Sequence, residues 1–157
     1  MSLTRLSGIS LALLGALVLA SPASLAAGTS STPEAEQVDY YKTAKKLIDD
    51  QDFAKAIPLL EQSIQANGAS ADAYNLLGFA HRKLGDTQKG MDYYMKALAI
   101  EPSHLGTNEY LGELYLELND LPKAEERLAV LETACGSCEE YQDLDKAVLK
   151  FKAANGQ

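Results

Sequence analysis

Apolar residues recur at helical spacing through most of the chain beyond its first quarter. The clearest stretch is 72–84, where an apolar stripe predicts an amphipathic helix. Its members are Leu76, Leu77, Ala80 and Leu84. Gly85 ends this helix, and Asp86 is placed to cap a second helix over 87–101. Pro102 ends the second helix, because the residue before a proline avoids the helical region. The pattern therefore predicts a helical hairpin.

Small residues and aspartates recur in three columns, each with a 34-residue period across three copies. The columns are Ala44, Gly78 and Gly112; Ala56, Gly90 and Ala124; and Asp52, Asp86 and Asp120. The small residues allow the two helices of each hairpin to approach closely. A single hairpin cannot bury its apolar stripe alone, so we expect the copies to stack into an all-α solenoid.

The middle copy resembles the repeat of the tetratricopeptide-repeat family, whose pattern is W-x-x-L-G-x-x-Y, then A-x-x-x-F, then P. The corresponding residues here are Tyr74-x-x-Leu77-Gly78-x-x-His81, then Gly90-x-x-x-Tyr94, then Pro102. Four of these positions depart from the pattern, but each holds a residue of related size or shape. The resemblance implies a short right-handed superhelical solenoid of three helical hairpins and a C-terminal capping helix.

These patterns divide the chain into six consecutive parts. We expect a signal peptide at 1–27, a flexible linker at 28–36, a degenerate first repeat at 37–70, a second repeat at 71–104, a third repeat at 105–138, and a capping helix with a short tail at 139–157.

The last part has an apolar stripe that predicts a helix covering the last hairpin. The stripe consists of Tyr141, Leu144, Ala147, Val148 and Phe151. We expect the lysines of this helix, Lys146, Lys150 and Lys152, to point outward.

The N-terminal part has the features of a secretory signal peptide. Arg5 supplies a positive charge before an uncharged run, and Ser24-Leu25-Ala26 offers a cleavage site followed by Ala27 or Gly28 as the mature N-terminus. The run is shorter than the roughly 20 apolar residues of a bilayer span. We expect export to a bacterial periplasm without stable membrane insertion after cleavage; an uncleaved N-terminal anchor is the alternative.

The formal net charge of −8 argues against nucleic acid and anionic lipid as partners. Affinity for such partners comes mainly from neutralising phosphates with basic residues.

The two cysteines, Cys135 and Cys138, form a CxxC pair between the third repeat and the capping helix. In an oxidising compartment a structural disulfide is the simplest interpretation. A labile redox pair and part of a metal site are the alternatives. The stretch from Cys135 to Leu144 is similar to the ending of exported bacterial tetratricopeptide-repeat proteins, which implies a recurring cap.

Residues suited to catalysis are scarce in this sequence. His81 occupies a packing position of the repeat, and His104 is expected in a loop. Neither has a nucleophile or a carboxylate at a spacing that suggests a catalytic pair. We therefore expect no enzymatic activity, no cofactor and no metal.

The resemblance implies that the first helix of each repeat lines a groove. Its groove positions correspond to Tyr41, Lys45 and Asp49; to Asn75, Phe79, Arg82 and Lys83; and to Glu109, Glu113, Leu116 and Glu117. We expect this groove to bind a protein or peptide as a periplasmic adaptor, scaffold or assembly factor. The alternatives are a merely solvated face and a redox protein that exchanges disulfides with a client through its CxxC pair. Self-association is left open.

The charges of the groove suggest a polarity for its ligand. Cations lie in the first two repeats around Phe79, which we expect to be exposed, and carboxylates lie in the third. A ligand crossing the repeats would then be acidic at one end, basic at the other and anchored on Phe79. We expect neither Phe79 nor Arg82 to stack repeats. The carboxylate clamp of chaperone-docking family members is not expected, because Asn75 and the first-repeat lysine are displaced from its pattern.

Overall fold

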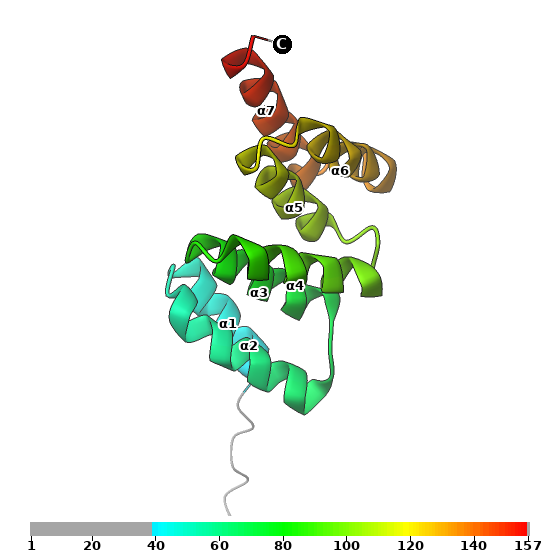
Figure 1. The fold of residues 1–157 in the computed structure, drawn as a ribbon. Helices are drawn as coiled ribbons and strands as arrows, with labels where there is room; N and C mark the ends of the chain where they lie inside the picture. The colour runs from blue at the N-terminus through cyan, green and yellow to red at the C-terminus, as the bar shows by residue number, and fades with distance from the viewer. Residues whose placement is uncertain (1–38, 157) are drawn as a thin grey trace, which may run out of the picture. The chain divides into compact units, whose positions relative to one another are not determined.

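The computed structural model describes residues 39–156, which form seven α-helices and no strand (Figure 1). The helices are α1 (Tyr40–Asp49), α2 (Phe53–Asn67), α3 (Ala71–Lys83), α4 (Thr87–Ile100), α5 (Leu105–Glu117), α6 (Leu121–Ala134) and α7 (Glu139–Ala154). The predicted signal peptide and linker lie outside the described residues. None of these helices is long and apolar enough to cross a membrane.

The helices pair as α1–α2, α3–α4 and α5–α6, and each hairpin packs on the next. The odd-numbered helices follow one another along one side, because α1 contacts α3, α3 contacts α5, and α5 contacts α7. The all-α solenoid of three hairpins and a closing helix is therefore confirmed.

Side-chain caps explain where most of these helices begin. Asp39, Asp86 and Asp120 each accept a hydrogen bond from the amide three residues further on, at 3.0, 3.2 and 3.3 Å. The predicted cap at Asp86 is thus present. His104 caps α5, since its Nδ1 accepts a hydrogen bond of 3.1 Å from the amide of Thr107. The sequence had indicated only a loop at this histidine.

Glycines allow the closest approaches between helices. A Cβ atom on Gly90 would lie 3.1 Å from the carbonyl oxygen of Gly78, so α3 and α4 meet backbone to backbone. A Cβ atom on Gly112 would lie 2.5 Å from a methyl carbon of Leu144. Gly112, the third member of the column Ala44, Gly78 and Gly112, therefore accommodates the closing helix α7.

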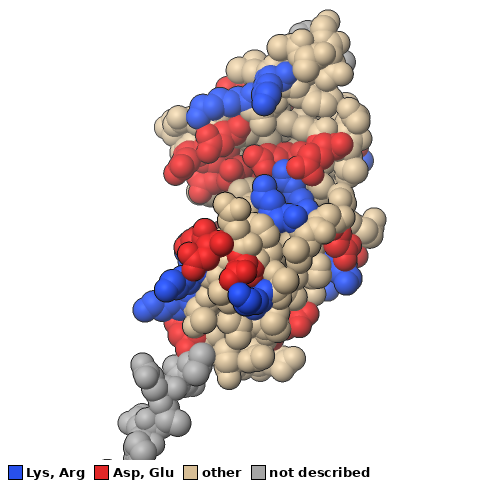
Figure 2. Space-filling model, turned by 90° about the vertical axis from the view of Figure 1, so that its left-hand side faces the viewer, with Lys and Arg blue, Asp and Glu red and all other residues tan. Residues whose placement is uncertain are grey.

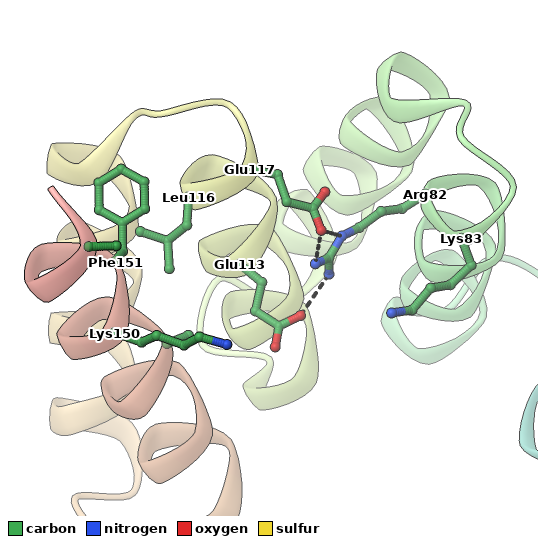
Figure 3. A pocket seen from close by; sticks show the side chains of 9 residues that line it. Arg82, Lys83, Glu113, Leu116, Glu117, Lys150 and Phe151 are labelled. Atoms are coloured by element: carbon green, nitrogen blue, oxygen red, sulfur yellow. Dashed lines mark hydrogen bonds and ion pairs between the residues drawn. The ribbon is translucent and has the colours of Figure 1, made fainter.

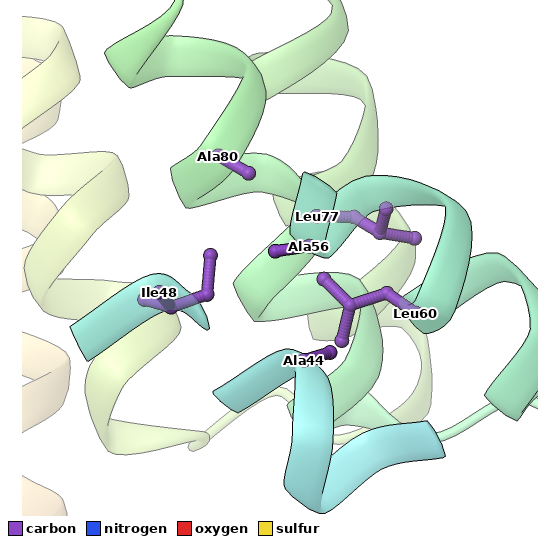
Figure 4. Close-up of a cluster of buried hydrophobic side chains, with 6 residues drawn as sticks. All are labelled: Ala44, Ile48, Ala56, Leu60, Leu77 and Ala80. Carbon is purple, nitrogen blue, oxygen red and sulfur yellow. The ribbon is translucent and has the colours of Figure 1, made fainter. Parts of the chain in front are cut away.

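Three clusters of buried apolar side chains hold the repeats together. The first joins α1, α2 and α3 around Leu60 and Leu77 (Figure 4). The second joins α4 to α5 around Tyr94 and Leu111, and the third joins α5, α6 and α7 around Leu144. The core therefore continues from one repeat into the next, as a stacked array requires.

Candidate functional site

A hollow of about 530 Å³ opens between α3, α5 and α7, and it is called the α3–α5–α7 hollow below (Figure 3). Its lining residues are Arg82 and Lys83 from α3; Glu113, Leu116 and Glu117 from α5; and Ala147, Lys150, Phe151 and Ala154 from α7. All five lining residues from α3 and α5 are among those predicted to line the groove.

Arg82 connects α3 to α5 at one wall of the hollow. Its Nη1 lies 2.8 Å from Glu113 Oε2, and its Nη2 lies 2.6 Å from Glu117 Oε1 (Figure 3). Nη1 also donates a hydrogen bond of 3.3 Å to the carbonyl oxygen of Tyr110. Burial alone would lower the pKa of the guanidinium, but the hydrogen bonds to the two glutamates raise it, so Arg82 stays charged.

The prediction that Arg82 is a free groove cation and does not stack repeats is wrong. Its side chain is only 6% exposed, and both of its carboxylate partners belong to the next repeat. Because Arg82 of the second repeat pairs with two of the predicted carboxylates of the third, the charges of the groove do not separate by repeat. Figure 2 shows the result on one face of the molecule, where basic side chains lie directly above and below an acidic band.

Phe79 is half-buried, which corrects the expectation of an exposed anchor. Its ring centroid lies 4.8 Å from that of Tyr110 in the third repeat and 5.8 Å from that of Phe53 in the first. It therefore packs between repeats, contrary to the sequence-based expectation. The ammonium group of Lys83 lies 5.1 Å from the centroid of the same ring.

Two lysines supply the unpaired positive charge of the hollow. Lys83 and Lys150 are exposed, and within the described residues neither forms an ion pair. They approach from opposite walls, Lys83 from α3 and Lys150 from α7 (Figure 3). The apolar side chains of Leu116 and Phe151 lie on the α7 side beside Lys150, whereas Glu113 and the Arg82–Glu117 pair lie between the two lysines (Figure 3).

The α7 residues of the hollow were not predicted as groove residues, although the sequence contained a signal for them. Helices α3, α5 and α7 begin at Ala71, Leu105 and Glu139, so the 34-residue period continues into α7. Helix α7 thus occupies the position that the first helix of a fourth repeat would have. Of its lysines that were expected to point outward, Lys150 lines the hollow and Lys152 pairs with Glu125 on α6.

The remaining predicted groove residues lie outside the hollow. Lys45 and Asp49 form an exposed pair at 3.7 Å on α1, and Tyr41 lines a smaller hollow of about 240 Å³. Asn75 is 7% exposed, and its Oδ1 has no hydrogen-bond partner in the described part of the chain. Nothing in the structure brings these four residues together with those of the α3–α5–α7 hollow.

Glu109 belongs to an acidic row on α5 and α7. Burial, followed by the charges of Glu113, Glu140, Asp143 and Glu139, raises the pKa of Glu109 to about 8. This carboxyl group is therefore largely protonated at neutral pH.

The cysteine pair closes the turn between α6 and α7. The structure joins Cys135 and Cys138 by a disulfide, with their Cα atoms 5.6 Å apart. Among residues 39–156 there is no group of three or more His, Cys, Asp or Glu side chains that could hold a metal ion.

Comparison with known proteins supports the repeat fold that the sequence predicted. Residues 71–104 match the family model described as Tetratricopeptide repeat. "Uncharacterized protein ycf37" of Guillardia theta is 31% identical over 100 residues, which cover 59% of this chain and 55% of that protein. The chain spans between 9% and 55% of the length of the first curated relatives that it matches.

Solved structures share the fold at low sequence identity. The Arabidopsis OM64 TPR domain has a TM-score of 0.64 at 17% identity, covering 71% of this chain and 92% of that one. The type III secretion translocator chaperone SycD of Yersinia enterocolitica has a TM-score of 0.62 at 15% identity, covering 73% and 87%. Residues 71–104 thus match a tetratricopeptide repeat, and the described part of the chain shares the all-α solenoid fold of these structures.

Proposed function

We propose that this chain is a non-enzymatic interaction module that binds a segment of a partner protein in the α3–α5–α7 hollow. One observation carries the proposal: a single open hollow combines an apolar part of its lining with two lysines that have no ion-pair partner among residues 39–156. Apolar surface that is exposed beside charged groups is typical of protein-binding sites. The likeness to a secretion chaperone and to other tetratricopeptide-repeat structures supports this class of function.

The chemistry of the hollow favours binding over catalysis. Its lining contains no serine, cysteine or histidine, and its two carboxylates are both engaged by Arg82. A nucleophile with an adjacent base, which covalent catalysis needs, is therefore not assembled in this hollow. We further propose that the chain acts after export, as a periplasmic adaptor, scaffold or assembly factor, on the evidence of the N-terminal sequence.

Site-specific photo-cross-linking in the native host tests the site of binding. A photoreactive amino acid is placed at Lys83 or Lys150 in the hollow, and at Met95 as the control. Met95 is on α4, is 52% exposed and does not line the hollow. We expect cross-links to a partner from the two hollow positions and not from the control. Cross-links from Met95 alone would move the binding site to another face.

A further inference from the structure

The charge of the α3–α5–α7 hollow differs in sign from that of the chain as a whole. The lining holds three cations and two carboxylates, whereas the chain has a formal net charge of −8. Arg82 pairs with both carboxylates, at 2.8 Å to Glu113 and 2.6 Å to Glu117, and this group of three side chains keeps one negative charge. The positive sign of the lining therefore comes from Lys83 and Lys150.

One of these lysines, Lys150, lies beside the apolar part of the lining. Leu116 is 9% exposed, Phe151 is half-buried, and both lie on the α7 side of the hollow with Lys150 (Figure 3). An apolar side chain of a ligand that contacts Leu116 and Phe151 places its neighbouring residues within reach of the long side chain of Lys150. A carboxylate at such a neighbouring position would gain a charge-assisted contact with Lys150 on binding.

The surroundings of the hollow indicate where an acidic residue of the ligand lies. The row of Glu109, Glu139, Glu140 and Asp143 lies towards the N-terminal ends of α5 and α7, whereas Lys83 and Lys150 lie towards the C-terminal ends of α3 and α7. An acidic group on the ligand is repelled by the row and attracted by the lysines, so it is favoured at the lysine end of the hollow.

Resting on the proposed function above, we propose that the ligand is an internal segment of a partner protein in which an apolar residue is followed or preceded closely by Asp or Glu. The apolar residue contacts Leu116 and Phe151, and the carboxylate lies beside Lys150, with Lys83 adding positive charge from the opposite wall. The carboxylate is that of a side chain because the hollow is open, which allows the ligand chain to continue past it in both directions.

Selection from a random peptide library tests this ligand chemistry. The peptides are displayed with constant sequence on both sides, so that every random residue is internal, and they are selected on the purified protein. We expect the enriched peptides to share an apolar residue close to Asp or Glu. Replacing that acidic residue by Asn or Gln in a synthetic, end-capped peptide should weaken binding about tenfold, because the charge-assisted contact with Lys150 is lost.

Charge reversal on the protein gives the matched measurement. Lys150→Glu should weaken binding of the enriched peptides by a similar factor, and replacing the acidic residue of the peptide by Lys should restore part of the loss in that variant. Lys42→Glu is the control, since Lys42 is exposed in the first turn of α1, where a carboxylate is tolerated. It makes the same change in net charge and should leave binding unchanged.

The outcomes separate this inference from the proposed function. Enriched peptides that require the hollow but show no preference for Asp or Glu, or that bind only through a free C-terminal carboxylate, would overturn the inference and leave the proposed function in place. If no peptide is enriched whose binding is sensitive to Lys83→Glu or Lys150→Glu, both are overturned.

Discussion

At the scale of single residues, Arg82 joins the second repeat to the third through one guanidinium group. It reaches two carboxylates and a backbone carbonyl of α5, and its side chain is nearly buried. We expect Arg82→Ala to lower the free energy of unfolding by roughly 1–3 kcal/mol, because charge-assisted bonds and the packing of a nearly buried side chain are lost, while Glu113 and Glu117 stay partly exposed to water. Arg82→Lys should recover little, since an ammonium cannot reproduce the planar fork of donors.

Chemical denaturation of the variants measures this effect. Lys45→Ala is the control, because Lys45 and Asp49 pair on the surface with side chains 58% and 64% exposed. Removing such a pair should change the free energy of unfolding by no more than about 1 kcal/mol. Equal stability of Arg82→Ala and Lys45→Ala would show that Arg82 does not hold the repeats together.

Glu109 predicts an unusual pH dependence. Burial and neighbouring carboxylates raise its pKa from 4.5 to about 8. Between these values the folded chain keeps a proton that the unfolded chain has released, so this residue lowers the free energy of unfolding as pH rises through that window. Glu109→Gln should remove this contribution and raise the melting temperature at pH 8 more than at pH 5.

Thermal melting across this pH range tests the effect against Glu132→Gln. Glu132 is exposed on α6 and forms no ion pair among residues 39–156. Its replacement should shift the melting temperature little and by a similar amount at every pH. Parallel curves for Glu109→Gln and wild type would contradict the raised pKa.

At the scale of helices and turns, the sequence predicted the hairpins well because their signals are local. Asp86 caps α4, Pro102 follows its end, and the glycine column marks where α3 meets α4. Helix α7 was predicted as a cap but not as a wall of the groove. Its apolar stripe indicates that it covers α5, while only the spacing of its first residue from that of α5 shows that it continues the series of first helices.

The disulfide at the turn between α6 and α7 leads to a prediction about this element. We expect Cys138→Ser to lower the melting temperature without unfolding the chain, because a loop this short restricts the unfolded state only modestly. The expected loss is about 1–3 kcal/mol. Helix α7 should stay in place, since Leu144 is fully buried against Gly112 and Lys152 pairs with Glu125.

The redox state of the freshly isolated protein decides between the interpretations of this pair. Thiol labelling before and after mild reductant should find both cysteines oxidised and slow to reduce. Free thiols in freshly isolated protein, or rapid reduction, would favour the alternative in which Cys135 and Cys138 exchange disulfides with a client.

At the scale of the whole molecule, the charges could not be assigned from the sequence. The resemblance placed five residues of the hollow correctly, but side chains from neighbouring repeats neutralise one another across a distance of more than 30 positions along the chain, as Arg82 and Glu113 do. Linear spacing shows which residues share a face and does not show which of them meet. The predicted polarity across the repeats failed for this reason, whereas Lys83 remained available.

At the same scale, the proposed adaptor role and an oxidised cysteine pair both depend on the predicted export of the chain. Arg5, the uncharged run from Gly8 to Ala20 and the site at Ser24-Leu25-Ala26 predict cleavage that leaves Ala27 or Gly28 as the N-terminus. Intact-mass analysis of protein from the periplasmic fraction should find one of these two ends and a mass lower by two hydrogens than that of the reduced chain. Arg5→Glu should slow export, because the positive charge of the leader is lost. Retention of Met1 in a membrane fraction would replace cleavage with an uncleaved anchor, while a full-length cytoplasmic protein with free thiols would contradict both export and the disulfide.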